Sequence, residues 1–222
     1  MAGTIIADFI RADANKISLN VGNTVVASIN ASGILSNTGA VMINSSGAIT
    51  ANNISTGRIV TPSVMPTGSV LQVIQTVKTD TFSTASTSFV DVTGLSVSIT
   101  PTSATSKILV LMDVKLGSAV NVTGYLKIVR DSTSIYIGDT DGSAQRATYG
   151  NSDDPSNQWP YQAVGNFLDS PATTSSVTYK VQLLSEPVEN TGTVYINRSG
   201  EGGTSASGVR TASSITVMEI AA

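Results

Sequence analysis

The stretch Ser28-Ile29-Asn30-Ala31-Ser32-Gly33-Ile34 recurs fourteen residues later as Met42-Ile43-Asn44-Ser45-Ser46-Gly47-Ala48-Ile49. A shorter third copy follows as Asn53-Ile54-Ser55-Thr56-Gly57-Arg58-Ile59. Each copy reads as a short strand, a turn of Asn, Ser and Gly, and a second short strand, because Gly and Asn tolerate the left-handed backbone of tight turns. The copies therefore predict a repeated β unit.

The repeats lie inside a stretch of 41 residues, Ile17 to Gly57, that has no charged side chain. A two-stranded hairpin is marginal in water, and a repeat needs neighbours to cover its apolar face. Three chains wound about one axis would turn the apolar positions inward and pair the exposed edges. We therefore predict that residues 17–60 form a trimeric fibrous shaft; a disordered linker is the alternative, which the regular apolar spacing disfavours. The predicted shaft core consists of Ile29, Ile34, Ile43, Ile49, Ile54 and Ile59.

Composition excludes several function classes. The chain has no Cys and no His, which excludes disulfides, thiolate metal sites, Ser-His-Asp triads and histidine-based zinc hydrolase sites. The net charge of −3 gives no attraction for nucleic acid. The longest apolar runs, such as Ile108 to Met112, are far shorter than the roughly 20 residues that cross a bilayer. We expect no enzyme activity, no cofactor, no nucleic-acid partner and no membrane insertion.

The chain after residue 60 has a different pattern. Two prolines and a glycine between Thr61 and Gly68 predict a neck or hinge at 61–68. Residues 69–222 then contain short segments of strand composition separated by Gly, Pro, Asp, Asn or Ser, with no convincing helix. This spacing favours an all-β sandwich, and a jelly roll accommodates the number of strands. The predicted strands are 70–78, 89–93, 95–100, 107–116, 124–130, 134–138, 163–168, 177–184, 193–197 and 214–220.

A long loop, 139–160, carries the candidate binding residues. Trp159 lies beside an acidic, amide-bearing segment, and an indole next to carboxylates and amides suits a sugar ring. For these two residues we favour packing of Trp159 and Tyr161 in the core or at a subunit interface, because large aromatic side chains dominate burial there. Asp153 and Asp154 are expected to form a solvated turn; the disfavoured alternative is a catalytic pair of carboxylates. The candidate residues are Tyr149, Asp153, Asp154, Asn157, Trp159 and Tyr161.

The same loop begins with a weak calcium-site pattern. Asp139-Thr140-Asp141-Gly142-Ser143 has two carboxylates and a glycine, but the twelfth position of such a loop requires Glu, and here it is Gly150. We therefore expect a plain Asp/Gly turn and no metal.

Several passages resemble fibre proteins of tailed bacteriophages, notably those of marine and cyanobacterial hosts. They are Gly3 to Asp13, the repeats described above, Gly68 to Gln75, and Thr100 to Val110. In that group a thin trimeric shaft carries a C-terminal knob similar in outline to the trimeric tumour-necrosis-factor and complement-C1q jelly rolls. Ser214 to Ile220 resembles the last strand of such knobs.

The resemblance implies a homotrimeric virion fibre, exposed to the extracellular medium. Its knob loops would bind a host-surface glycan or protein, and residues 1–16 would attach to a tail, neck or capsid protein. That terminus has an apolar cluster that is not expected to fold alone, so a virion socket or the trimer itself would hold it. The attachment candidates are Ile5, Ile6, Phe9, Ile10 and Arg11.

Three alternatives remain open. A head fibre or capsid decoration protein would have the same architecture without receptor contact. A depolymerase tailspike is disfavoured by the short length and the absence of His. A bacterial surface or spore-coat filament with a C1q-like tip is disfavoured because no export signal is visible.

Overall fold

The computed structural model describes residues 16–21, 24–30, 33–36, 41–44, 65–151, 159–187, 192–200 and 208–222. The chain divides into two units, Met1–Thr61 and Pro62–Ala222. Within the described ranges every regular element is a β-strand, and no helix there has the length and hydropathy to span a membrane.

The first unit contains a four-stranded antiparallel meander. Its strands are β1 (Lys16–Val21), β2 (Thr24–Asn30), β3 (Gly33–Ser36) and β4 (Val41–Asn44), paired in that order. Ile29 pairs with Ile34 and Ile34 pairs with Ile43, so three predicted core positions occupy one row across β2, β3 and β4. The first repeat thus forms a strand pair, as predicted.

Other predictions for this part of the chain remain predictions. Ile49, Ile54 and Ile59 lie outside the described residues, as does the whole attachment cluster around Phe9. The trimeric arrangement of the shaft is likewise a prediction.

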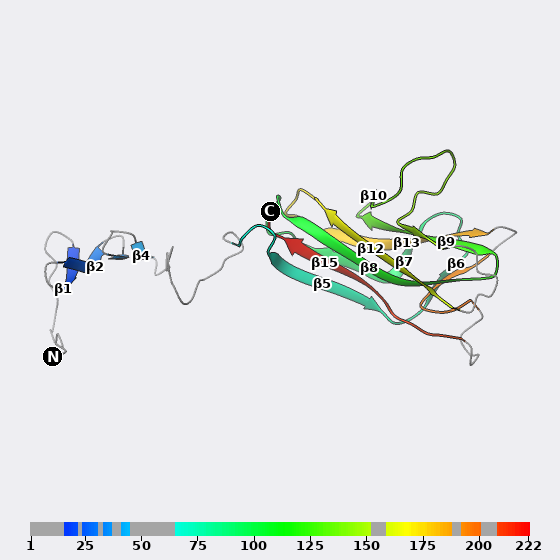
Figure 1. Cartoon of the computed structure of the whole chain (residues 1–222), viewed down its shortest axis with the longest axis horizontal. Helices are drawn as coiled ribbons and strands as arrows, with labels where there is room; N and C mark the ends of the chain where they lie inside the picture. Colours follow the sequence, from blue (N-terminus) through cyan, green and yellow to red (C-terminus); the bar gives the residue numbers. More distant parts are fainter. Residues whose placement is uncertain are drawn as a thin grey trace. The chain divides into compact units, whose positions relative to one another are not determined.

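The second unit is a sandwich of two antiparallel sheets (Figure 1). The first sheet has the main strand order β5, β15, β8, β12. Past the end of β15, the short strand β14 pairs with β8, and β6 pairs with β14. The second sheet has the order β10, β9, β13, β7, with β11 also paired to β9. The first sheet comprises β5 (Val70–Lys78), β6 (Phe82–Thr84), β8 (Lys107–Ser118), β12 (Tyr161–Asp169), β14 (Val194–Ile196) and β15 (Ser213–Ile220). The second comprises β7 (Val90–Ile99), β9 (Val122–Arg130), β10 (Thr133–Ile135), β11 (Tyr149–Gly150) and β13 (Val177–Pro187).

The order of the eight principal strands is of the jelly-roll type. Numbered along the chain, β5, β7, β8, β9, β10, β12, β13 and β15 are strands one to eight. The first sheet then has the order 1-8-3-6 and the second 2-7-4-5, so most connections cross from one sheet to the other. The predicted all-β sandwich is confirmed.

The core lies between the two sheets because alternate side chains of each strand point inward. On β8, Val110 pairs with Val217 of β15 and Met112 pairs with Ile215, and all four are buried. The opposing sheet contributes buried side chains such as Leu126 of β9 to the same cluster. This alternation of buried and less buried residues is the expected pattern of a sandwich strand.

Two predicted strands differ from the structure. The segments 89–93 and 95–100 form the single strand β7, because Gly94 adopts a φ of 80° at an irregularity in the pairing with β13 and the ladder continues on both sides. The predicted strand 134–138 ends at Ile135, since Tyr136 has a φ of 52° and leaves the extended conformation. The short strands β6 and β11 were not predicted.

Candidate binding surfaces

An aromatic group lies where β11 and β12 approach each other. Trp159 is 63% exposed, just before Tyr161 begins β12. Tyr149 on β11 is half-buried and packs against the core. Burial, and secondarily the nearby phenol of Tyr161, raise the pKa of Tyr149. The three aromatic candidates therefore divide into two half-buried tyrosines and one exposed indole outside the core of the described chain.

Asn151, directly after β11, fixes the chain within the predicted loop 139–160. Its Oδ1 accepts a hydrogen bond of 2.5 Å from the backbone N–H of Gly124, and its own N–H donates to the Gly124 carbonyl over 3.1 Å. The Nδ2 group donates to the hydroxyl of Ser118 at 3.3 Å. Sequence reasoning missed this residue because Gly-Asn-Ser resembles any polar turn. Asp153, Asp154 and Asn157 lie outside the described residues.

The first part of the same predicted loop, residues 139–148, is exposed for most of its length. Gly142 has a φ of 51°, and the N–H of Ala144 donates to the carbonyl of Asp141 over 2.9 Å, which closes a turn. Arg146 donates from Nε to the carbonyl of Gly138 at 2.8 Å. Within the part of the chain that the structure describes, no group of three acidic side chains is placed to hold a metal ion.

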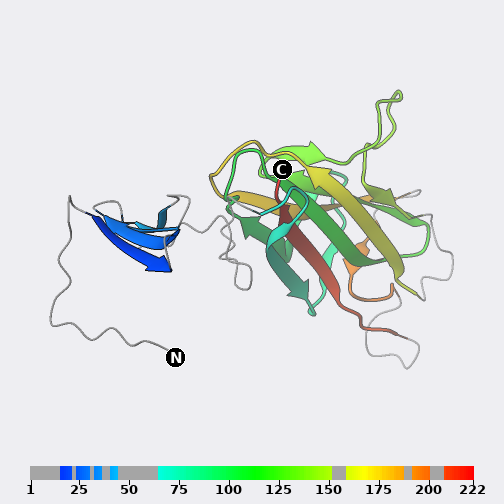
Figure 2. The ribbon, with the colours of Figure 1, turned by 60° about the vertical axis from the view of Figure 1, so that its left-hand side comes forward.

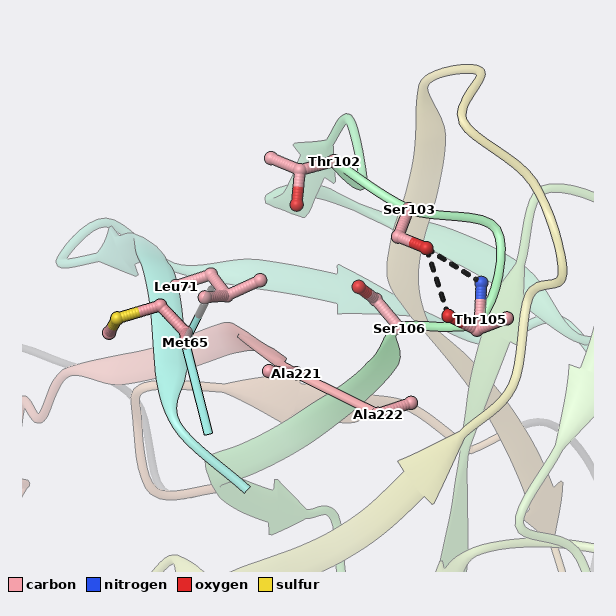
Figure 3. A pocket seen from close by; sticks show the side chains of 8 residues that line it. All are labelled: Met65, Leu71, Thr102, Ser103, Thr105, Ser106, Ala221 and Ala222. Atoms are coloured by element: carbon pink, nitrogen blue, oxygen red, sulfur yellow. Dashed lines mark hydrogen bonds between the residues drawn. The ribbon is translucent and has the colours of Figure 1, made fainter. Parts of the chain in front are cut away.

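A hollow of about 600 Å³ lies at the end of the sandwich where β5 begins and β15 ends (Figure 3). The hydroxyls of Ser103 and Thr105 there are hydrogen-bonded to each other, with 2.9 Å between the two oxygens. None of the lining side chains is ionisable. The lining residues are Met65, Leu71, Thr102, Ser103, Thr105, Ser106, Ala221 and Ala222.

The aromatic group and this hollow lie at opposite ends of the first sheet. Tyr161 pairs with Leu116 at one end of β8, while Ile220 pairs with Lys107 at the other. Nine steps along a strand separate those two pairs, which corresponds to about 30 Å. The aromatic group therefore lies far from the end at which the chain enters and leaves the sandwich.

Comparisons with known proteins add little. No protein-family model matches the chain, and no curated protein matches it. Among solved structures, the chain is similar to the VP2 subviral particle of infectious bursal disease virus, with 11% sequence identity and a TM-score of 0.29. The match covers 68% of this chain but only 38% of that one, so the chain spans well under half the length of this structural relative. A likeness at this level carries no argument about function.

Proposed function

We propose that this chain is a homotrimeric fibre protein of a tailed-bacteriophage particle. Its N-terminal segment attaches to a tail, neck or capsid protein, the repeated segment forms the stem, and the sandwich contacts the host cell surface. The protein works by adhesion and has no enzymatic role. Three weak sites on one stem, with several fibres per particle, raise avidity by about 10²-fold or more without tight single contacts.

The observation that carries the proposal is that the chain ends and the exposed indole of Trp159 lie at opposite ends of the sandwich. The N–H of Gly68 donates to the carbonyl of Ala221 over 2.8 Å, and the N–H of Ala221 donates to Ser69 over 2.9 Å. These bonds fix both ends of the sandwich chain at the same end of the sheets. The exposed indole of Trp159 lies near the other end, where a receptor-binding residue of a fibre tip belongs.

The chemistry near Trp159 favours a glycan as the receptor. A flat, exposed indole stacks on the apolar face of a sugar ring, and the neighbouring tyrosine hydroxyls can exchange hydrogen bonds with sugar hydroxyls. A rigid ring also loses little conformational entropy on binding.

The test uses the full chain with a fluorescent label, applied to a panel of bacterial cells and to lipopolysaccharide purified from them. We expect saturable binding to some strains, a loss of at least tenfold for Trp159→Ala, and little change for Tyr136→Ala, which removes another exposed aromatic ring. Antibodies against the sandwich should label the fibres of purified particles. Labelling of the capsid surface without cell binding would favour the decoration role, and release of reducing sugar would overturn the non-enzymatic role.

A further inference from the structure

Two arginines lie directly opposite each other near the end of the first sheet where β12 begins. Arg198, two residues after β14, forms an isolated antiparallel bridge with Arg210. Basic residues are scarce in this chain, with 12 Lys and Arg among 222 residues. Directly opposed residues of an antiparallel pair have Cα atoms about 5 Å apart, and like charges in that position are destabilising. An anion bound between the two guanidinium groups would remove this cost. We call Arg198 and Arg210 the arginine pair.

The guanidinium group of Arg198 is held in a fixed orientation. Its central carbon lies 4.2 Å from the ring centre of Tyr195. Its Nε donates to the carbonyl of Ser199 over 3.0 Å, and its Nη2 donates to the carbonyl of Gly200 over 3.4 Å. A guanidinium has five N–H groups, so these two bonds orient it without using all of its donors. A planar group of N–H donors that is already oriented matches the oxygens of a carboxylate or a phosphate.

Asn197 determines on which side of the sheet Arg198 lies. The residues before and after Tyr195 are buried in the core, so Tyr195 faces the outer side. In a regular strand Arg198, three residues further on, would face the core. Asn197 has a φ of 63°, which reverses this alternation and places the guanidinium of Arg198 over the Tyr195 ring. The buried side chain of Asn197 donates to the carbonyls of Lys78 and Asp80, at 2.8 and 2.9 Å, which fixes this reversal in place.

Strand β8 leaves room for this arrangement. Tyr195 pairs with Gly117, and a Cβ on Gly117 would clash with the carbonyl oxygen of Arg198. A residue without a side chain therefore lets the chain at Arg198 lie close against β8. The single acidic residue of β8, Asp113, already forms an ion pair with Lys115. Strand β8 thus supplies no further carboxylate to the arginine pair.

The arginine pair and Trp159 lie at the same end of the first sheet. Tyr161 and Ile196 both pair with Leu116, from opposite edges of β8. Two strand spacings, about 10 Å, therefore separate β12 from β14 at this point. Figure 2 shows β8, in green, between β12, in yellow, and β15, in red; β14 follows β15 along the same edge of β8. A glycan that stacks on Trp159 can therefore extend toward the arginine pair.

We propose that the arginine pair binds the negatively charged group of the glycan receptor, either a phosphate or the carboxylate of an acidic sugar. The inference rests on the proposed function, which supplies the glycan, and it names the class of sugar that the site selects. A chain with a net charge of −3 has no general attraction for an anion, so a local pair of cations is needed to hold one. Hydrogen bonds from the two guanidinium groups to the oxyanion are of the strong, charge-assisted kind.

Arginine-specific labelling tests the site without bacterial cells. Phenylglyoxal modifies accessible guanidinium groups in the full chain, and peptide mass mapping measures each arginine separately. We expect inorganic phosphate or glucuronate to slow the modification of Arg198 and Arg210 at least fivefold, relative to chloride at the same ionic strength. Arg146, an exposed arginine of the 139–148 segment, should react at the same rate in all three salts. Equal protection of all three arginines, or of none, would overturn the inference.

Two further arms identify the anion and test a rival explanation. Protection by phosphate alone identifies a phosphorylated sugar as the ligand, and protection by glucuronate alone identifies an acidic sugar. The rival explanation is that a carboxylate of the chain itself neutralises the arginine pair. Glu201 is the acidic residue nearest to Arg198 in sequence and lies outside the described residues. Protection should be the same in Glu201→Gln as in the wild type, and protection seen only in Glu201→Gln would overturn the inference.

Binding to lipopolysaccharide separates this inference from the proposed function. Arg210 is exposed, so Arg210→Gln should fold normally and should weaken binding at least tenfold. Lys127→Gln, which removes one charge from the outer side of the second sheet, should change binding less than twofold. Loss of binding in Trp159→Ala with no effect of Arg210→Gln would overturn the inference alone. Protection of the arginine pair in a protein that binds no cell and no lipopolysaccharide would keep the anion site and overturn the adhesive role.

Discussion

Gln72 on β5 donates a hydrogen bond of 2.6 Å from Nε2 to the carboxylate of Glu219 on β15, and so joins the first and last strands of the sandwich. Glu219 is fully buried. It also accepts hydrogen bonds of 2.7 Å from the N–H and the hydroxyl of Thr102. These donors take the place of the water molecules that the carboxylate loses on burial.

The Glu219 site predicts an acid-dependent part of the stability. Burial alone would raise the pKa of Glu219, but hydrogen bonds from Gln72, Ser106 and Thr102 outweigh it, and the pKa lies below its ordinary value of 4.5. A carboxyl with a lowered pKa stabilises the fold above its unfolded-state value, and this contribution is lost as the pH falls through the folded-state value. Urea unfolding between about pH 5 and pH 3 should therefore show a steeper loss for the wild type than for Glu219→Gln. Thr102→Val should lie between them, and equal slopes would contradict the assignment.

A second buried carboxylate predicts a large loss of stability. Asp169 accepts two hydrogen bonds from Nη1 of Arg130, at 2.9 and 2.8 Å, and one of 2.7 Å from the hydroxyl of the buried Tyr179. Asp169→Ala removes the partner of the Tyr179 hydroxyl and the ion-pair partner of Arg130, and should lower the free energy of unfolding by about 3 kcal/mol. Tyr179→Phe removes one bond and should cost about 1 kcal/mol. Urea titrations measure both, and an Asp169→Ala cost below that of Tyr179→Phe would contradict the prediction.

Two glycines form a matched pair for testing backbone packing. A Cβ on Gly117 would clash with the carbonyl oxygen of Arg198, whereas a Cβ on Gly138 would meet nothing within 4 Å. The first contact involves backbone, so β8 or the segment that contains Arg198 must shift. We expect Gly117→Ala to lower the free energy of unfolding by about 2 kcal/mol. Gly138→Ala should change it by less than about 0.5 kcal/mol. Thermal unfolding of the two variants checks the order, and similar melting temperatures would contradict it.

Most strands could be predicted because they depend on local pattern. The β-branched and apolar composition of β5 and the apolar run of β8 lie in contiguous residues, and the structure has strands at both places. Gly94 misled the prediction, because glycine usually marks a strand end, whereas pairing with β13 continues the ladder past it. Tyr136 shows the opposite error, since a φ of 52° is not visible in a β-like sequence.

The sites were less predictable because their partners are distant in sequence. Trp159 and Tyr161 could be chosen from residue type, but Asn151 acquires its role only from Gly124 and Ser118, which β9 and the end of β8 bring close. The exposed apolar side chains on the outer side of the first sheet, Val164 and Leu168 among them, were missed for a related reason. Leu109 and Leu111 predict a strand, but which side of the sheet remains open depends on how the two sheets stack.

Trp159 and Tyr149 should respond differently to truncation, although both belong to the aromatic group. Trp159 is mostly exposed, so Trp159→Ala should change the free energy of unfolding by less than about 0.5 kcal/mol while weakening glycan binding. Tyr149 packs against the core, so Tyr149→Ala should cost about 2 kcal/mol. Denaturant titration, with lipopolysaccharide binding measured on the same preparations, separates the two effects. If Trp159→Ala were as destabilising as Tyr149→Ala, the indole would serve packing, and the case for a sugar-stacking platform would fail.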